Sequence, residues 1–153
     1  MMTTASKVIS ALAGKTLVTA ESLTGGGIGA TLTAVPGASK VFNGGIISYT
    51  DAVKREVLGV PDEILSWEGA VSASVASAMA AGARNALQAD IAVSVTGLAG
   101  PDGDEFGHPV GTVFIGYADG NVVTAGEYHF SGDREAVRRQ TIAAALECIL
   151  DHV

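Results

Sequence analysis

A serine and a lysine in this chain are residue types that nucleophilic catalysis can use, and each lies just beyond an expected strand. Ser22 follows the short apolar run at residues 15–20 (KTLVTA) and precedes three consecutive glycines at residues 25–27. Free N–H groups at such a glycine-rich helix start can hold an oxyanion or a phosphate, and a hydroxyl there is a candidate nucleophile. The alternative is that Ser22 or Thr24 merely caps the helix while the glycines allow close packing. The contiguous glycines match neither a dinucleotide-binding fingerprint nor a P-loop.

A nucleophilic serine needs a base, and we consider lysine a better candidate than histidine. His108 precedes a proline, His129 lies in an expected strand and His152 is next to the last residue, so each is interpreted as structural or solvated. Lys54 comes five residues after Tyr49, just beyond the second expected strand. A lysine has an ordinary pKa of about 10.4, so it acts as a base near neutral pH only if burial or a like charge lowers that pKa. Taken alone, a lysine at this position is more typical of a solvated surface.

A third polar loop follows the expected strand at residues 91–95. Its glycines, Gly97 and Gly100, allow the backbone to approach a ligand closely. Its carboxylates, Asp102, Asp104 and Glu105, have the oxygen ligands that a hard cation prefers, but their spacing is not that of an EF-hand. We therefore interpret these carboxylates as solvated and expect no metal.

Two arginines near the start of the last expected helix are candidates for contact with an anion. Arg134 and Arg138 are four residues apart and so share a helix face. Either can pair with a phosphate or a carboxylate, and a surface ion pair with Asp133 or Glu135 is an equally open interpretation.

The elements that must position these residues alternate between strands and helices. Helices are expected at residues 3–13, 26–34, 51–58, 61–66, 72–88 and 133–151, and strands at residues 15–20, 45–49, 91–95, 110–117 and 122–130. The Asp-Gly-Asn sequence at residues 119–121 predicts a hairpin between the last two strands. The fold class is therefore α/β: a single-domain layered sandwich over residues 1–153, with a mixed sheet and flanking helices. In such folds ligands bind beyond the carboxyl ends of the strands, where the three polar loops lie.

Composition excludes several classes of protein. The 153 residues are 48% hydrophobic and 16% charged, which is enough for a packed core and argues against disorder. No apolar run is long enough to span a membrane. A net charge of −7 argues against nucleic-acid binding, which needs a basic surface. The single cysteine, Cys148, is expected in the core, and the absence of both a disulfide and an apolar leader favours a cytoplasmic protein.

With those residues in view, the chain resembles the C-terminal domain family of the competence- and damage-inducible protein CinA, which also occurs as stand-alone nicotinamide-nucleotide amidases. The resemblance runs from about residue 11 to residue 150 and rests on several ordered blocks. These are A-E-S-x-T-G-G at residues 20–26, V-P-G-A-S at 35–39, G-G at 44–45, Tyr49 with Lys54, L-G-V-P at 58–61, G-A-V-S at 69–72, T-G-x-A-G-P-D-G at 96–103, V-G-T-V at 110–113, and G-D-R at 132–134 with Arg138.

The resemblance implies hydrolysis of the carboxamide of nicotinamide mononucleotide, without a metal or other cofactor, in a homo-oligomer. It implies Ser22 as nucleophile, Lys54 as base, Tyr49 as proton relay or orienting hydroxyl, and Arg138 as a site residue. The oxyanion and phosphate contacts are expected among Thr24, Gly25, Gly26, Thr96, Gly97, Gly100 and Arg138. The family commonly has cysteine after the serine, and Leu23 at that position argues against a thiol nucleophile.

Two other hypotheses remain open at this point. The first is that the chain is a nucleotide-binding or interaction module without turnover, because motif residues alone do not prove an active geometry. The second is that it is an amidase for another small carboxamide. The small-residue helix expected at residues 72–88 is a candidate interface between subunits.

Overall fold

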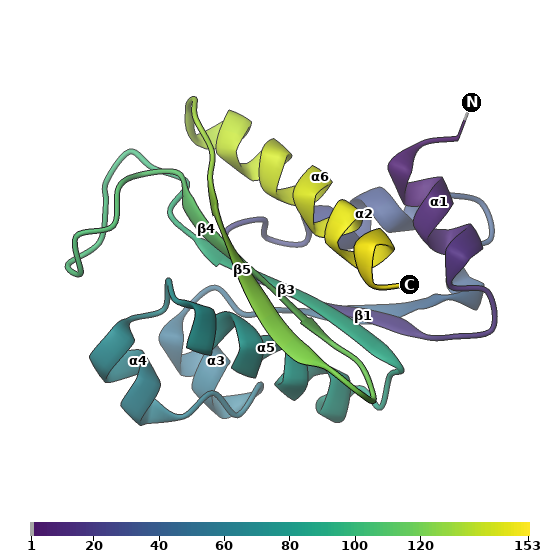
Figure 1. The fold of residues 1–153 in the computed structure, drawn as a ribbon, viewed down its shortest axis with the longest axis horizontal. Coiled ribbons are helices and arrows are strands. Elements are labelled where there is room, and N and C mark those ends of the chain that lie inside the picture. The colour runs from purple at the N-terminus through teal and green to yellow at the C-terminus, as the bar shows by residue number, and fades with distance from the viewer. Residues whose placement is uncertain (1) are drawn as a thin grey trace.

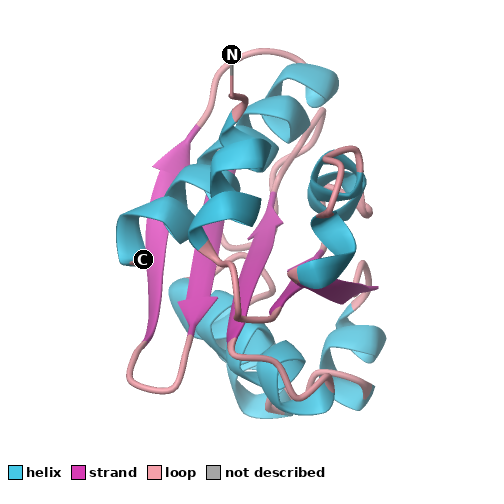
Figure 2. Ribbon diagram, turned by 90° about the vertical axis from the view of Figure 1, so that its right-hand side faces the viewer, coloured by secondary structure: helices cyan, strands magenta, loops and turns pink. Residues whose placement is uncertain are grey.

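The structure is a computed structural model that describes residues 2–153, and it consists of a mixed sheet between two layers of helices (Figure 1). The five strands are β1 (Leu17–Glu21), β2 (Phe42–Ile47), β3 (Ile91–Gly97), β4 (Thr112–Ala118) and β5 (Val123–His129). They lie in the order β2-β1-β3-β4-β5, in which the first three are parallel and the last two are antiparallel additions. The strands turn progressively from one edge of the sheet to the other, the usual twist of such sheets (Figure 2). The predicted α/β fold with a mixed sheet is confirmed.

Helices cover both faces of this sheet. The helices are α1 (Thr4–Ala11), α2 (Gly27–Thr33), α3 (Asp51–Glu56), α4 (Asp62–Glu68), α5 (Ala73–Ala86) and α6 (Arg134–His152), with a short 3-10 turn at Ala38–Lys40. One layer contains α1, α2 and α6, and the other contains α3, α4 and α5 (Figure 1). None of the described helices has the length and apolar character needed to cross a membrane.

Side chains of β1 alternate between the two layers, and this alternation aims the residues that follow. Leu17 belongs to the core beneath α1, α2 and α6, whereas Val18 and Ala20 belong to the core beneath α5. Because successive side chains of a strand point to opposite faces, Glu21 is directed toward α2 and Ser22 toward the α3–α5 layer. The Ser22 amide donates to the Val95 carbonyl at 3.1 Å, which fixes Ser22 at the carboxyl end of the parallel strands.

The apolar face of α5 packs against the sheet of its own chain. Val75, Met79 and Ala83 are fully buried in that contact. A Cβ added at Gly116 of β4 would lie 2.3 Å from the Ala76 carbonyl oxygen, so the small residues permit this close approach. The apolar face of the helix offered as a candidate subunit interface is therefore buried within its own chain, and a subunit interface on its remaining surface stays a prediction.

Most element boundaries differ from the prediction by one or two residues, and the largest difference is at the start of β2. β2 begins at Phe42 rather than at residue 45, because Phe42 already pairs with Leu17; its internal glycines concealed the start of the strand. Pro61 is the N-cap of α4 rather than its first helical residue.

Candidate active site

Ser22 and Lys54 meet at the carboxyl edge of the sheet. The Lys54 ammonium or amine nitrogen (Nζ) lies 3.0 Å from Ser22 Oγ, although the two residues are 32 positions apart. Two backbone carbonyls complete its surroundings: Ser48 O at 2.8 Å and Tyr49 O at 3.2 Å. These contacts are within hydrogen-bond distance, so the nucleophile and base expected from the sequence are adjacent without movement.

Burial tunes Lys54 toward the role of a base. The residue is only 1% exposed, although it belongs to the short helix α3. Burial lowers the pKa of the Lys54 amine from its ordinary 10.5 to about 8, and the nearby Asp51 carboxylate partly opposes that effect. About a tenth of Lys54 is therefore neutral at pH 7 and about half at pH 8, and this neutral form is able to accept a proton.

Local backbone structure holds Lys54 in place. The Thr50 side chain caps α3 by accepting from the Val53 amide at 3.3 Å, and Ser48 is tied to β1 by its amide, which donates to Glu21 O at 2.8 Å. Both carbonyls that accept from Lys54 lie in the segment between these two anchors. The segment after β2 thus positions Lys54 as β1 positions Ser22.

Glu21 is a buried residue of this region for which the sequence analysis assigned no role. Its side chain is 2% exposed and accepts four hydrogen bonds: from Thr24 Oγ1 at 2.6 Å, Thr19 Oγ1 at 3.2 Å, the Ile28 amide at 2.8 Å and the Gly29 amide at 3.0 Å. The available signal was an acidic residue at the end of an otherwise apolar strand, directly before a glycine-rich helix start. Glu21 fastens the end of β1 to the start of α2, and Ser22 lies between the two.

This network changes the expected role of the glycine-rich start. The first free amides of α2 are occupied by the Glu21 carboxylate, so they do not form an open cradle for a phosphate. The Gly25 amide donates to Ser22 O at 3.2 Å, and the Thr24 hydroxyl is committed to Glu21. Neither Ser22 nor Thr24 caps the helix through its side chain: the N-cap is Gly26, at φ +102°. Gly27, the first residue of α2, does allow the expected close packing, because a Cβ there would lie 2.6 Å from Ile142 Cδ1 of α6.

Arg138 supports the loop that carries the nucleophile. Its Nε donates to Leu23 O at 2.9 Å and its Nη2 donates to Thr24 O at 3.2 Å. The guanidinium comes from α6, in the layer opposite Lys54. In this structure it is held by backbone carbonyls of the nucleophile loop.

Tyr49 and Arg134 form a separate pair at the rim. Tyr49 is 59% exposed, and its hydroxyl accepts from Arg134 Nη2 at 3.2 Å. Arg134 also donates to Gly100 O at 2.5 Å, which ties the loop after β3 to α6. Within residues 2–153 the Tyr49 hydroxyl makes no hydrogen bond with Ser22 or Lys54, so its direct link to Lys54 is through the backbone carbonyl.

A cavity of about 440 Å³ opens beside the Ser22–Lys54 pair. The cavity is lined by residues from the three strand-end loops and from the segment between α4 and α5: Ser22, Tyr49, Asp51, Lys54, Leu65, Gly69, Ala70, Val71, Thr96, Gly97, Leu98, Asp104, Glu105 and Phe106. Thr96 and Gly97 therefore reach it as expected, whereas Gly100 is not in its lining. The Thr96 hydroxyl donates to Ala70 O at 2.8 Å, and a Cβ at Gly97 would lie 2.7 Å from Thr112 O, so both also have packing roles.

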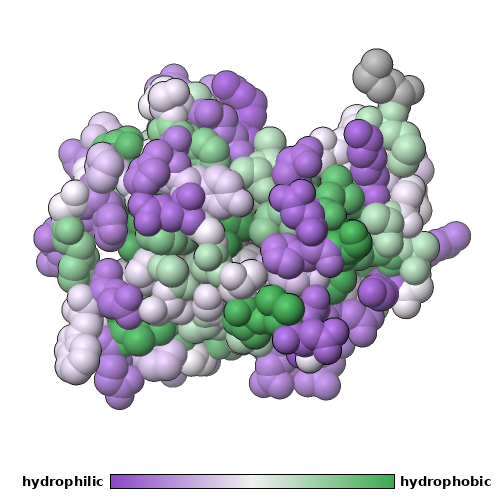
Figure 3. Space-filling model, viewed as in Figure 1, coloured by the Kyte–Doolittle hydropathy of each residue, from purple (hydrophilic) through white to green (hydrophobic). Residues whose placement is uncertain are grey.

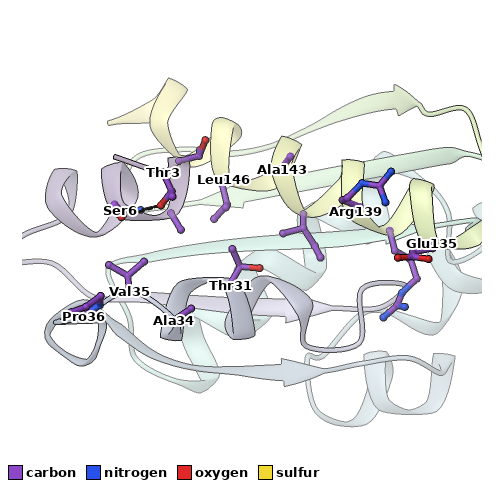
Figure 4. Close-up of a pocket in the computed structure, with 14 residues that line it drawn as sticks. Thr3, Ser6, Thr31, Ala34, Val35, Pro36, Glu135, Arg139, Ala143 and Leu146 are labelled. Carbon is purple, nitrogen blue, oxygen red and sulfur yellow. Dashed lines mark hydrogen bonds between the residues drawn. The ribbon is translucent and has the colours of Figure 1, made fainter. Parts of the chain in front are cut away.

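A larger groove of about 860 Å³ lies on the other side of the sheet, between α1, α2 and α6 (Figure 4). Side chains from all three helices line it, with Leu146 and Val35 among its apolar groups and Glu135 and Arg139 at one end. It contains neither Ser22 nor Lys54. The smaller cavity is therefore the candidate active site, because it is the one of these two that the Ser22–Lys54 pair lines.

The fold and this pair define a class: an α/β protein with a candidate serine–lysine hydrolytic site at the carboxyl edge of its parallel strands. The model of the CinA C-terminal domain family matches residues 2–153. The chain belongs to the CinA C-terminal domain family.

Relatives in sequence and in structure agree with this assignment. The chain is 49% identical over 134 residues to the nicotinamide-nucleotide amidohydrolase PncC of Pseudomonas putida, covering 88% of this chain and 84% of the relative. It is 48% identical to a CinA-like protein of Geobacter metallireducens but spans only 32% of that longer protein. A CinA superfamily protein of Escherichia coli superposes with a TM-score of 0.94 at 33% identity, covering 99% of this chain and 91% of the other. The competence/damage-inducible protein of Agrobacterium tumefaciens gives 0.93 at 38% identity, with 97% and 92% covered.

Proposed function

We propose that this protein hydrolyses the carboxamide of nicotinamide mononucleotide, giving nicotinate mononucleotide and ammonia. The observation that carries the proposal is the 3.0 Å contact between Lys54 Nζ and Ser22 Oγ at the edge of an open cavity. The similarity to a nicotinamide-nucleotide amidohydrolase over most of both chains supports the choice of substrate.

Lys54 is the general base in this proposal. A neutral amine has two N–H groups and one lone pair, and the carbonyls of Ser48 and Tyr49 accept from two N–H groups. The lone pair is then directed at the third neighbour, the Ser22 hydroxyl. Lys54 takes the hydroxyl proton while Ser22 Oγ bonds to the amide carbon, and the tetrahedral intermediate forms.

Collapse of this intermediate breaks the C–N bond. The Lys54 ammonium returns its proton to the departing nitrogen, which leaves as ammonia, and Ser22 carries the acyl group. Water then attacks the ester with Lys54 again acting as base, which releases the carboxylate and restores the serine. Each proton taken by Lys54 is given back within the same half of the cycle.

The developing oxyanion needs donors near Ser22. Among residues 2–153 the amides of Leu23, Thr24 and Gly26 have no hydrogen-bond acceptor, whereas that of Gly25 is bonded to Ser22 O. The amide after a nucleophile at a strand-to-helix turn is the usual oxyanion donor in hydrolases of that geometry. We assign this role to the Leu23 amide, with Thr24 and Gly26 as the further candidates.

The phosphate of the substrate is placed at the rim of the cavity. Arg134 lies there and is exposed, although it donates to the Tyr49 hydroxyl and the Gly100 carbonyl, whereas the Arg138 guanidinium is half-buried against two carbonyls of the loop after Ser22. An exposed guanidinium suits a phosphate that remains partly in water. Arg134 therefore replaces Arg138 as the proposed phosphate contact.

Replacement of Ser22 by alanine tests the proposal. Ser22→Ala is expected to lower ammonia release from nicotinamide mononucleotide by roughly 10³-fold or more, because the acyl-enzyme can no longer form. Ser39→Ala, at an exposed serine outside the cavity, is the matched control and keeps wild-type turnover. Circular dichroism and thermal melting establish that both variants remain folded.

The outcomes separate the three hypotheses. Wild-type turnover in Ser22→Ala contradicts the assignment of the nucleophile. Calorimetric binding of the nucleotide by the wild-type protein without any ammonia release favours a binding module. Faster release from another carboxamide in a panel of pyridine compounds indicates a different substrate.

A further inference from the structure

The cavity beside Ser22 and Lys54 is lined by more negative than positive side chains. Asp51, Asp104 and Glu105 contribute carboxylates, and Lys54 is the single basic residue of this lining, with a pKa lowered by burial to about 8. Arg134 lies outside this lining, on the rim. The wall is therefore suited to a group that carries positive charge.

Two of the three carboxylates are available to a ligand. Asp104 is committed to its own loop: its Oδ1 accepts from the amides of Phe106 at 3.1 Å and His108 at 2.9 Å, and its Oδ2 contacts His108 Nδ1 at 2.7 Å. By contrast, the side chains of Asp51 and Glu105 make no hydrogen bond or ion pair within residues 2–153. Glu105 has no hydrogen-bond or ion-pair partner there, and Asp51 interacts with the protein only through the electrostatic effect by which it raises the pKa of Lys54.

Two aromatic side chains line the same cavity and remain accessible. Tyr49 is 59% and Phe106 is 41% exposed. A Cβ on Gly69 would lie 2.5 Å from Phe106 Cε2, so the ring rests against the bare backbone of the segment between α4 and α5. Absence of a side chain at residue 69 therefore permits the loop after β3 to place Phe106 at the cavity. Aromatic faces attract cations through the ring quadrupole and also stack on flat heterocycles.

We propose that this cavity selects the positive charge of the substrate ring, with Asp51 and Glu105 supplying the opposite charge and Tyr49 and Phe106 the aromatic faces. The inference rests on the proposed function, in which the substrate is a nicotinamide nucleotide. The ring of such a nucleotide is an N-substituted pyridinium and carries a fixed positive charge. The same carboxylates repel the carboxylate that hydrolysis creates, which favours release of the product.

Binding to an inactive variant separates recognition from chemistry. The probes are nicotinamide mononucleotide and its reduced form, which keeps the phosphate, ribose and carboxamide but has a neutral dihydropyridine ring. Titration calorimetry with Ser22→Ala is expected to show roughly tenfold tighter binding of the charged ring, as one or two partly exposed ionic and cation–π contacts provide. Adding Glu105→Gln and Asp51→Asn is expected to reduce that preference to about twofold, since the amides keep the shape and lose the charge.

Glu63→Gln in the same Ser22→Ala background is the matched control. It removes one negative charge from an exposed residue of α4 outside the cavity lining, so the preference stays near tenfold. Equal affinity for the two probes, tighter binding of the neutral one, absence of binding by the charged one, or a preference that survives both substitutions overturns the inference. Failure of the proposed function is distinguished by the wild-type protein, which then releases no ammonia from the nucleotide.

Discussion

The two walls of the cavity are built differently. The wall that carries Ser22 is fastened from two sides, by the four hydrogen bonds of Glu21 and by the two that Arg138 donates to Leu23 and Thr24. The opposite wall is the loop between β3 and β4, which extends from the body of the molecule (Figure 1). Most residues from 101 to 110 in that loop are exposed, and the loop is ordered mainly by Asp104 and by the Arg134–Gly100 contact.

The two walls meet different requirements: one must hold the reacting groups in place, and the other must bind and release the substrate. A nucleophile and its base lose rate when displaced by about an ångström, so their wall needs a rigid frame. A wall that contacts the substrate ring, as proposed above, has to admit and release ligands, and an exposed loop allows that. On the face of the molecule shown in Figure 3, hydrophobic residues form separate patches among hydrophilic ones.

Among the variants considered below, the one that removes the Lys54 amine is expected to lower kcat the most. Lys54→Met keeps the length and apolar stem of the side chain but removes the amine. We expect kcat to fall by roughly 10²–10⁴-fold, the usual contribution of a general base. Steady-state ammonia release measures it, and Lys40→Met, at an exposed lysine far from the cavity lining, is the control. A loss of less than a few-fold would show that another group removes the proton.

The pH profile of the wild-type protein gives the same test without a substitution. The protonated amine cannot act as a base, so activity rises with pH and levels off above the pKa of Lys54, about 8. Below that value kcat/KM is expected to fall about tenfold per pH unit. Asp51→Asn removes a carboxylate that raises this pKa, so the inflection moves to lower pH. A profile that is flat between pH 6 and 9 contradicts the assignment of Lys54.

Glu21→Gln weakens the frame while leaving Ser22 and Lys54 in place. A glutamine presents one N–H₂ group where the carboxylate accepted hydrogen bonds, so at least one donor among Thr24, Ile28 and Gly29 loses its partner. We expect kcat to fall by roughly 10–100-fold with KM nearly unchanged, and the free energy of unfolding to fall by about 1–3 kcal/mol.

The matched control for Glu21→Gln is Asp133→Asn. Asp133 also uses a carboxylate to cap a helix, accepting from the Ala136 amide at 2.9 Å at the exposed start of α6, and asparagine caps equally well. Equal losses in the two variants, or a change confined to KM, would falsify the positioning role of Glu21.

A smaller effect distinguishes the two arginines. Arg138→Lys cannot reproduce both hydrogen bonds to the nucleophile loop, so kcat is expected to fall about tenfold for nicotinamide mononucleotide and for the corresponding riboside alike. Arg134→Lys is expected to raise KM several-fold for the mononucleotide only, because the riboside lacks the phosphate. The exposed Arg139 supplies the control, Arg139→Lys. The reverse pattern would return the phosphate contact to Arg138.

The sequence predicted the elements and the places of Ser22 and Lys54 better than it predicted the contacts that hold them. Strand periodicity and helix signals fixed the layers, and the strand-end rule placed Ser22 and Lys54 at one edge. The role of Glu21 was missed because a buried carboxylate is explained only by its partners, and two of those partners lie seven and eight residues away on α2. Burial of Lys54 was equally invisible, since a charged residue in a short helix is usually solvated and only tertiary packing makes it 1% exposed.

Asp104→Asn is expected to have the smallest effect, because it alters the open wall alone. Burial raises the pKa of Asp104, but hydrogen bonds from His108 and from the Phe106 amide outweigh that effect and hold the pKa below its ordinary value. Asparagine keeps one oxygen for those amides and loses the ionic part of the contact with His108. We expect KM to rise about two- to threefold with kcat unchanged, and stability to change by less than about 0.5 kcal/mol, as for a partly exposed ion pair. A fall in kcat as large as that of Glu21→Gln would mean that the loop after β3 belongs to the rigid frame, and the contrast between the two walls would then be wrong.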